Sequence, residues 1–283
     1  MIKEWIQEYK PQNQEEAEAA LREIMQEVAL AGLQRAGFFE KAAFYGGTAL
    51  RIFYGLNRFS EDLDFSLLEV SPEFSLEPYF KGMINEFEAI GMHVSINEKN
   101  RKQESNIDSA FLKSETIWKE LVLEGVIPQA GLESTPKIKI KLEVDREPPL
   151  GFTTEEKLLL RPFSFYVKCY SLPDLFAGKM HALLFRNWKQ RVKGRDWYDL
   201  EWYIKKGVPL HVEHFLMRAI DSGNWSESTI SKEQILALLQ QKIETVSFNR
   251  IREDIIRFIP DASVLDIWSP QYFKDLVGKI KFG

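Results

Sequence analysis

The chain has 283 residues, of which 37 are Lys or Arg and 42 are Asp or Glu, so its formal net charge is −5. Hydrophobic residues make up 45% of the chain and charged residues 28%, which excludes a disordered or fibrous protein. The single cysteine, Cys169, excludes a disulfide scaffold and suits a reducing compartment. No stretch has the apolar core of a signal peptide or the roughly 20 apolar residues of a membrane span, so we expect a cytoplasmic protein.

The first half of the chain alternates between helical and extended patterns. Residues 14–36 carry apolar side chains at helical spacing, and residues 48–54 predict a shorter helix that Gly55 is placed to end. Strand-like alternation of apolar and polar residues occurs in four stretches, 61–68, 92–96, 107–112 and 138–144. This order predicts a mixed sheet flanked by helices.

The second half is richer in helical patterns. Pro148-Pro149 and the polar residues that follow predict a joint between two domains, 1–150 and 151–283. Beyond the joint, helical patterns cover residues 175–188 and 196–206 and recur through 208–283. We therefore expect an α+β protein whose C-terminal domain is mainly helical.

A short apolar run ends in a pair of glycines, Gly46 and Gly47, directly before the helix that begins at Thr48. Residues without side chains let the backbone approach a bulky ligand closely. The N-terminus of the helix offers unpaired N–H groups to phosphate, and Thr48 can add a hydroxyl donor. Glycine-rich turns often only connect two elements of secondary structure, so by itself this turn is weak support for a phosphate site.

Asp62 and Asp64, about fifteen residues further on, strengthen this interpretation. Two positions apart on a strand, their side chains share one face, with Cα atoms roughly 6–7 Å apart. Neighbouring carboxylates repel each other unless a cation neutralises them, and Mg²⁺ prefers such oxygen ligands together with substrate phosphates. Two exposed acids on an edge strand are the alternative interpretation, which the nearby glycine turn disfavours.

A third carboxylate is expected from the strand at 138–144. Lys139, Lys141, Glu143 and Asp145 share its polar face, and either acid would reach the same ions if this strand lies beside residues 61–68. We prefer Asp145, which ends the strand, and keep Glu143 as its competitor. Surface acids that balance neighbouring lysines are the structural alternative.

A second group of charged residues follows the joint. Lys179 and Arg186 share one face of a predicted helix. The ammonium of Lys179 and the planar guanidinium of Arg186 would together suit a triphosphate. Asp196 opens the next helix. The alternatives are that Lys179 is merely solvated, that Arg186 pairs with an acid, and that Asp196 only caps its helix.

The helix opened by Asp196 follows a basic run. Lys189, Arg191, Lys193 and Arg195 crowd into seven residues, and we expect them to form a solvated face. Asp199 lies four residues after Arg195, the spacing of an ion pair within a helix. We therefore predict that Asp199 pairs with Arg195.

The glycine turn followed by Ser-Glu-Asp-Leu-Asp-Phe (60–65) resembles the DNA polymerase β-type nucleotidyltransferase superfamily. The block at 179–186, leading to Arg-Asp-Trp-Tyr-Asp-Leu (195–200), narrows the resemblance to the AbiEii/AbiGii toxin family. These proteins are the toxin half of abortive-infection and type IV toxin–antitoxin systems. The similarity covers roughly residues 40–205, and the C-terminal 75 or so residues carry no motif that extends it.

The resemblance implies a polymerase β-like fold that transfers a nucleoside monophosphate from an NTP to an acceptor and releases pyrophosphate. It assigns Lys179 to nucleotide phosphate contact and Asp196 to the active site. The expected catalytic residues are Asp62, Asp64, Asp145, Lys179 and Asp196, the first three of them as ligands of two Mg²⁺ ions, or of Mn²⁺ in their place. The expected nucleotide-binding residues are Gly46, Gly47, Thr48, Arg51, Ser60, Lys179 and Arg186.

The resemblance also implies an RNA acceptor, in particular a tRNA 3′ end, and a cognate antitoxin encoded nearby. Two rival functions share the same motifs. The first is a nucleotidyltransferase that acts on a small molecule such as an aminoglycoside or on a protein hydroxyl. The second is a non-catalytic nucleotide-binding module, which the intact pair of acids disfavours because a site released from catalysis has no need to keep them.

Overall fold

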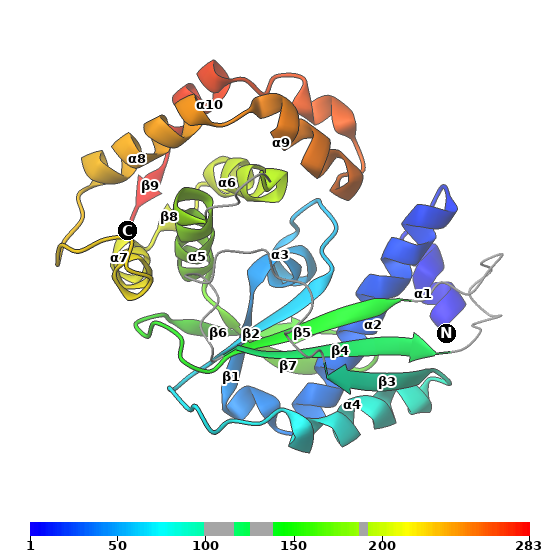
Figure 1. Cartoon of the computed structure of the whole chain (residues 1–283). Helices are drawn as coiled ribbons and strands as arrows, with labels where there is room; N and C mark the ends of the chain where they lie inside the picture. The colour runs from blue at the N-terminus through cyan, green and yellow to red at the C-terminus, as the bar shows by residue number, and fades with distance from the viewer. Residues whose placement is uncertain (99–115, 125–137, 187–191) are drawn as a thin grey trace.

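The computed structural model describes residues 1–98, 116–124, 138–186 and 192–283. A mixed seven-stranded sheet forms its centre, with the strand order β3-β4-β5-β2-β1-β7-β6 (Figure 1). Its strands are β1 (Ala42–Tyr45), β2 (Asp62–Leu67), β3 (His93–Glu98), β4 (Thr116–Glu124), β5 (Lys139–Asp145), β6 (Thr154–Leu159) and β7 (Phe165–Tyr170). Two short parallel strands, β8 (Pro209–Leu210) and β9 (Lys281–Phe282), form a second sheet.

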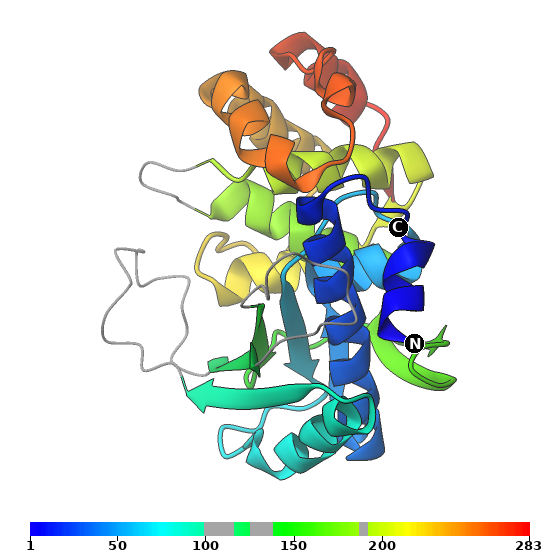
Figure 2. The same cartoon turned by 90° about the vertical axis from the view of Figure 1, so that its right-hand side faces the viewer.

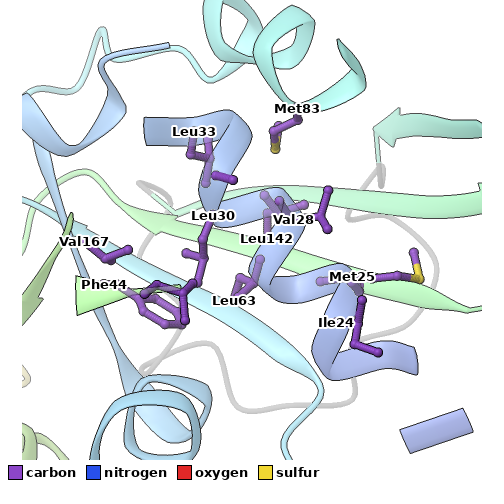
Figure 3. Packing of buried hydrophobic residues seen from close by; sticks show 14 of the residues in the cluster. Ile24, Met25, Val28, Leu30, Leu33, Phe44, Leu63, Met83, Leu142 and Val167 are labelled. Carbon is purple, nitrogen blue, oxygen red and sulfur yellow. The ribbon is translucent and has the colours of Figure 1, made fainter. Parts of the chain in front are cut away.

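One face of the large sheet is covered by α2 (Gln14–Arg35) and α4 (Glu77–Ala89), with α1 (Ile2–Glu8) packed against α2 (Figure 2). Asn13 caps α2, because its side chain accepts a hydrogen bond from the Glu16 amide. Apolar side chains of α2 lie over the strands, as Figure 3 shows for Val28 and Leu30 above Leu63 and Leu142. This layer is the first hydrophobic core.

The opposite face of the sheet meets α3 (Gly46–Tyr54) and the C-terminal helices (Figure 1). These helices are α5 (Leu172–Phe185), α6 (Gly194–Lys206), α7 (Val212–Asp221), α8 (Lys232–Thr245), α9 (Phe248–Ile255) and α10 (Pro270–Val277). Short 3₁₀ helices occur at Phe38–Glu40, Ile256–Phe258 and Ala262–Leu265. A second core, centred on α5 and α6, includes the fully buried Trp268 and Phe273.

The pairing around β2 decides which side chains face the C-terminal helices. β2 runs parallel to β5 and antiparallel to β1, with Asp64 opposite both Glu143 and Tyr45. Leu63 and Phe65 are fully buried under α2, so the alternation of the strand turns Asp64 and its neighbour Asp62 toward the other face. The acids therefore lie where the sheet meets α3 and α5.

The predicted α+β architecture is confirmed: a mixed sheet flanked by helices precedes a mainly helical part. The helix over 14–36, the helix ended by Gly55 and the strands near 61–68, 92–96 and 138–144 all form. The predicted strand at 107–112 lies outside the described residues. No helix within the described ranges is both long and apolar enough to cross a bilayer.

The interpretation of residues 153–156 as part of a joint is wrong. They enter β6, which pairs antiparallel with β7, and β7 pairs in parallel with β1. The sheet therefore continues to Tyr170, past the predicted domain boundary at residue 150. Polar residues tolerate this position because β6 is an edge strand, where alternate side chains face solvent.

Candidate active site

A cavity of about 180 Å³ opens between the first residues of β2, the start of α3 and one face of α5. Its lining combines carboxylates with an excess of basic side chains, a composition that suits a polyanion held with a cation. The charged lining residues are Arg58, Asp62, Asp64, Glu143, Asp174, Lys179, Arg186, Lys193, Arg195, Asp196 and Arg218.

The glycine turn lies directly against the acids, as predicted. Gly46 has a φ of +84°, and a Cβ there would overlap the carboxylate of Asp64. A Cβ on Gly47 would lie 2.8 Å from Arg58 Nη2 and 2.9 Å from Ser60 Oγ. Both glycines belong to the first turn of α3, whose N-terminus lacks a side-chain cap in the structure as described. The free N–H groups of this turn are therefore available to an anion beside the acids.

Three carboxylates line the cavity here, those of Asp62, Asp64 and Glu143, and the charges of Asp62 and Glu143 act on Asp64. Burial raises the pKa of Asp64 to about 7, and the charges of Glu143 and Asp62 act in the same direction. Burial likewise raises the pKa of Glu143, although its ion pair with Lys141 opposes the shift. The ionised acids are therefore unfavourable together until a cation joins them.

The preference for Asp145 over Glu143 as the third acid is not supported by this geometry. Glu143 is paired with Asp64 across the strands and lines the cavity, whereas Asp145 is paired with Ser66 and does not line it. Asp145 instead accepts a hydrogen bond from the Glu147 amide. The alternation of residues could not distinguish Glu143 from Asp145, because both lie on the same face of β5. Which of the two lies beside Asp64 depends on how β5 is aligned with β2.

Two expected nucleotide-binding residues do not line the cavity. Thr48 is fully buried, and its hydroxyl donates to the carbonyl of Asp62 at 2.5 Å. Arg51 lies on another side of α3, where its Nε is 2.8 Å from Glu23 Oε2. Thr48 therefore joins α3 to β2, and Arg51 joins α3 to α2. The remaining expected residue of this segment, Ser60, does line the cavity.

Lys179 reaches the cavity from α5 with an acid beside it. Its Nζ is 2.7 Å from Asp199 Oδ2, and Asp199 also accepts from Arg58 Nε at 2.6 Å and Nη2 at 2.7 Å. Asp199 is 0% and Arg58 2% exposed. The predicted pairing of Asp199 with Arg195 is therefore wrong, because the side chain of Asp199 points into the protein, whereas Arg195 faces Glu61 at 3.8 Å.

Arg186, at the end of α5, lines the cavity, and no ion pair engages it within the part of the chain that the structure describes. Its charge acts on both Glu143 and Lys193. The alternative that Arg186 serves to pair with an acid across a helix interface finds no support here.

The end of the basic run lines the cavity instead of forming a solvated face. Lys193 and Arg195 border it together with Asp196, in the first turn of α6. Burial, followed by the charge of Arg186, lowers the pKa of Lys193 to about 8. Asp196 is buried and is not an N-cap, since the N-cap of α6 is Lys193.

Sequence reasoning missed Arg58 and misjudged the role of Lys193. Arg58 precedes the acid motif by only a few residues, and a lone arginine beside such a motif is a signal that could have been used. Lys193 belongs to a run of alternating basic residues that resembles an ordinary exposed loop. Only the return of the chain from α5 to α6 brings its side chain to the acids of β2.

The residues present fit a divalent cation of the Mg²⁺ type. Among the residues that the structure describes, no three His, Cys, Asp or Glu side chains are grouped closely enough to enclose a metal ion by themselves. Mg²⁺ does not need such a cage, because it is held by one or two carboxylates while phosphate oxygens and water complete its shell. Burial, followed by the charges of Glu143 and Asp62, raises the pKa of Asp64, and a bound cation would counteract these effects.

Comparison with solved structures identifies the fold as that of nucleotidyltransferases. The structure is similar to MenT4, a nucleotidyltransferase toxin from Mycobacterium tuberculosis, with a TM-score of 0.61 and 14% identity over 98% of this chain and 88% of that one. It is also similar to a putative nucleotidyltransferase from H. pylori, with a TM-score of 0.51 and 18% identity over 92% of each chain. A search of curated proteins found no match.

The family model "Nucleotidyl transferase AbiEii toxin, Type IV TA system" matches residues 28–278. The chain belongs to this family of nucleotidyltransferase toxins from type IV toxin–antitoxin systems. The match extends well beyond residues 40–205, so the C-terminal helices that flank the cavity are part of the family unit.

Proposed function

We propose that this AbiEii-family nucleotidyltransferase, acting in the cytoplasm, transfers a nucleoside monophosphate from an NTP to an RNA acceptor, in particular a tRNA 3′ end. The observation that carries the proposal is that the Asp62, Asp64 and Glu143 carboxylates line one cavity together with the free N-terminus of α3. The acceptor is inferred from the resemblance to the toxin family and from the basic lining. The loss of usable tRNA would account for toxicity.

In this proposal Asp62 and Asp64 hold the cation, and Glu143 replaces Asp145 as the third carboxylate. A bound divalent ion supplies charge neutralisation at the phosphoryl oxygens and lowers the pKa of the attacking hydroxyl. Glu143, which lies opposite Asp64 across the strands, would accept the proton of that hydroxyl.

The triphosphate would lie along the start of α3. The N–H groups of Gly46 and Gly47 and the hydroxyl of Ser60 would bind its oxygens, since all three residues line the cavity. Lys179 of α5 and Arg186 at its C-terminal end would neutralise the charge that grows on the departing pyrophosphate. Asp199 holds the Lys179 ammonium at one side of the cavity until substrate arrives.

The test is incubation of the full chain with each of four labelled NTPs and Mg²⁺ or Mn²⁺, in parallel with total RNA, total protein and aminoglycosides. We expect label in the RNA fraction, at the 3′ end of tRNA, and none with Asp64→Asn. Label in the aminoglycoside or protein fraction would establish the first rival function. No label in any fraction, combined with NTP binding, would establish the non-catalytic module.

The family also points to a cognate antitoxin, and we propose that a small DNA-binding repressor is encoded beside the toxin gene. Induction of the toxin alone should arrest growth, and induction of the Asp64→Asn variant should not. Co-expression of the neighbouring reading frame should restore growth if it encodes the antitoxin.

A further inference from the structure

We propose that Arg218 binds a backbone phosphate of the acceptor strand, on the flank of the cavity opposite to the one where Asp199 holds Lys179. This inference rests on the proposed function and assigns one side of the same cavity to the nucleic acid. The occupant is a phosphodiester of a single-stranded 3′ end.

Arg218 enters the cavity from α7, which packs against α5 on a different side from α6 (Figure 1). Its guanidinium lies over Gly178, where a Cβ would be 3.8 Å from Arg218 Cζ. Gly178 directly precedes Lys179, whose side chain turns toward Asp199 of α6. The two cations are therefore close to adjacent positions of α5 but on separate flanks of it, Arg218 coming from α7 and Lys179 from α5 itself.

Arg218 lacks a partner of its own. Its Nε is buried without a hydrogen-bond acceptor, and no hydrogen bond or ion pair joins its guanidinium to any other residue of the described ranges. A buried donor left unsatisfied costs free energy. An arginine that faces a cavity in this state is prepared for an anion, and its planar fork matches a phosphate.

Tyr45 and Tyr170 lie in the field of Arg218, and burial raises the pKa of both phenols well above their ordinary value, so they are neutral. His181 and His214 are neutral as well, because burial, followed by the charge of Arg218, lowers the pKa of each to about 3. Asp64, Asp145 and Asp174 act on the two tyrosines together with Arg218, but none of the three forms an ion pair with it in the described part of the chain.

The nearby acid Asp174 is already engaged. Its carboxylate accepts hydrogen bonds from the Thr153 amide at 2.8 Å, from the Thr153 and Ser171 hydroxyls at 2.7 Å each, and pairs with His211 Nδ1 at 2.5 Å. Three of these contacts are to Oδ2, and the contact with His211 is to Oδ1. Asp174 therefore faces the cavity with its hydrogen bonds directed to Thr153, Ser171 and His211, and within the described residues it makes no ion pair with Arg218.

The phosphate that Arg218 binds is assigned to the acceptor because the NTP phosphates have another place. The cations that act most strongly on Asp64 are Lys179 and Lys193, and Arg186 acts on Glu143. The triphosphate belongs beside these acids and the turn of α3. Arg218 is not among the charges that act most on either acid; from the α7 side of the cavity it acts on Tyr170 and on Tyr45, the residue paired with Asp64. An acceptor whose terminal hydroxyl reaches the acids would carry its backbone phosphate past this second flank.

The test compares steady-state incorporation of labelled NTP into a tRNA, and into a short single-stranded RNA, by the wild type, Arg218→Gln and Arg218→Lys. Arg250→Gln is the matched control, because Arg250 is exposed and does not line the cavity. We expect Arg218→Gln to raise the KM for RNA at least tenfold and to leave the KM for NTP within twofold. Arg218→Lys keeps a point charge and should give an intermediate KM for RNA.

Salt dependence provides a second readout that a purely structural role would not change. Each phosphate contact with a single strand contributes a slope of about −0.7 to log affinity against log salt concentration. The slope for RNA binding, measured by fluorescence anisotropy, should therefore be shallower by about 0.7 in Arg218→Gln and unchanged in Arg250→Gln.

A raised KM for NTP with an unchanged KM for RNA would overturn the assignment and place Arg218 on the nucleotide. Unchanged values for both substrates would also overturn it. If Arg218→Gln does not fold, the same comparison is made with Arg218→Lys, because lysine keeps a long, positively charged side chain at this position. Failure of the wild type to label RNA at all is a different result, because it contradicts the proposed function and removes this inference with it.

Discussion

The ammonium of Lys179 lies 2.7 Å from the carboxylate of Asp199, a residue that is itself fully buried. Asp199 also carries the bidentate pair with Arg58, so one carboxylate holds two cations. Lys179 can therefore move to a triphosphate while Arg58 keeps Asp199 paired. The arrangement presents a cation at the cavity without leaving a buried acid unbalanced when substrate binds.

Asp199→Asn should lower the free energy of unfolding by about 3–5 kcal/mol, because it leaves Arg58 charged and buried without its partner. Urea denaturation at pH 7 measures the loss. Asp275→Asn, on the exposed surface of α10, is the matched control and should change the free energy by less than about 0.5 kcal/mol. A loss as small as that of the control would show that the Arg58–Asp199 pair does not stabilise the fold.

The same pair predicts a pH dependence. Burial alone would raise the pKa of Asp199, but the charges of Arg58 and Lys179 outweigh it and lower the pKa to about 2. A lowered folded-state pKa gives stability that is fully present above the unfolded value near 4 and is lost as pH falls toward 2. The stability difference between wild type and Asp199→Asn should be constant above pH 5 and shrink between pH 4 and pH 2. A difference that stays constant down to pH 2 would contradict the prediction.

Glu143→Gln and Asp145→Asn distinguish the two candidates for the third carboxylate. A metal contributes several kcal/mol to the transition state, and each 1.36 kcal/mol is a factor of ten in rate. We expect Glu143→Gln to lower kcat by at least about 10²-fold and Asp145→Asn to lower it by less than about tenfold, because only Glu143 lines the cavity. A larger loss of kcat in Asp145→Asn than in Glu143→Gln would show that Asp145, and not Glu143, is the third carboxylate.

Gly46→Ala tests the close approach of the α3 turn to the acids. Both Gly46 and Gly55 have left-handed φ values, +84° and +76°, so alanine at either position carries backbone strain of about 1–2 kcal/mol. Only Gly46 has a neighbour in the way, namely Asp64. Thermal unfolding should show a larger loss for Gly46→Ala than for Gly55→Ala, and only Gly46→Ala should lose NTP incorporation. Equal losses of stability and activity would contradict this.

A divalent cation should stabilise the protein through Asp62 and Asp64. Adding Mg²⁺ with a non-hydrolysable NTP should raise the Tm of the wild type, because a ligand that binds only the folded state shifts the unfolding equilibrium. Asp64→Asn should abolish the shift produced by Mg²⁺, and EDTA should reverse it in the wild type. An equal shift in both proteins would place the cation elsewhere.

The sequence motifs predicted many of the residues that line the cavity, because each motif depends on the spacing of nearby residues. The pair Asp62 and Asp64 shares a face wherever a strand forms, and Gly46 with Gly47 starts a helix that no side chain caps in the described chain. Periodicity predicted that Lys179 and Arg186 share a helix face, and both line the cavity, although Arg186 lies just after the end of α5. These predictions needed no knowledge of how distant segments pack.

The errors have a different origin. The start of the edge strand β6 was interpreted as part of a joint because an edge strand tolerates the polar residues that also mark loops. The partner of Asp199 was sought within its own helix, whereas the true partner, Arg58, lies 141 residues away in sequence. Local spacing contains no information on such a contact.

From the chain of amino acids alone follow the class of fold, the acid pair on its strand and the glycine turn beside it, since alternation and helical periodicity act over a few neighbouring residues. The packing of β2 against β5 in one register decided that Glu143, and not Asp145, lies with those acids. The packing of α6 and α7 on different sides of α5 decided which cations reach the cavity. Register and helix packing depend on contacts between segments far apart in the chain, and only the folded protein brings these together.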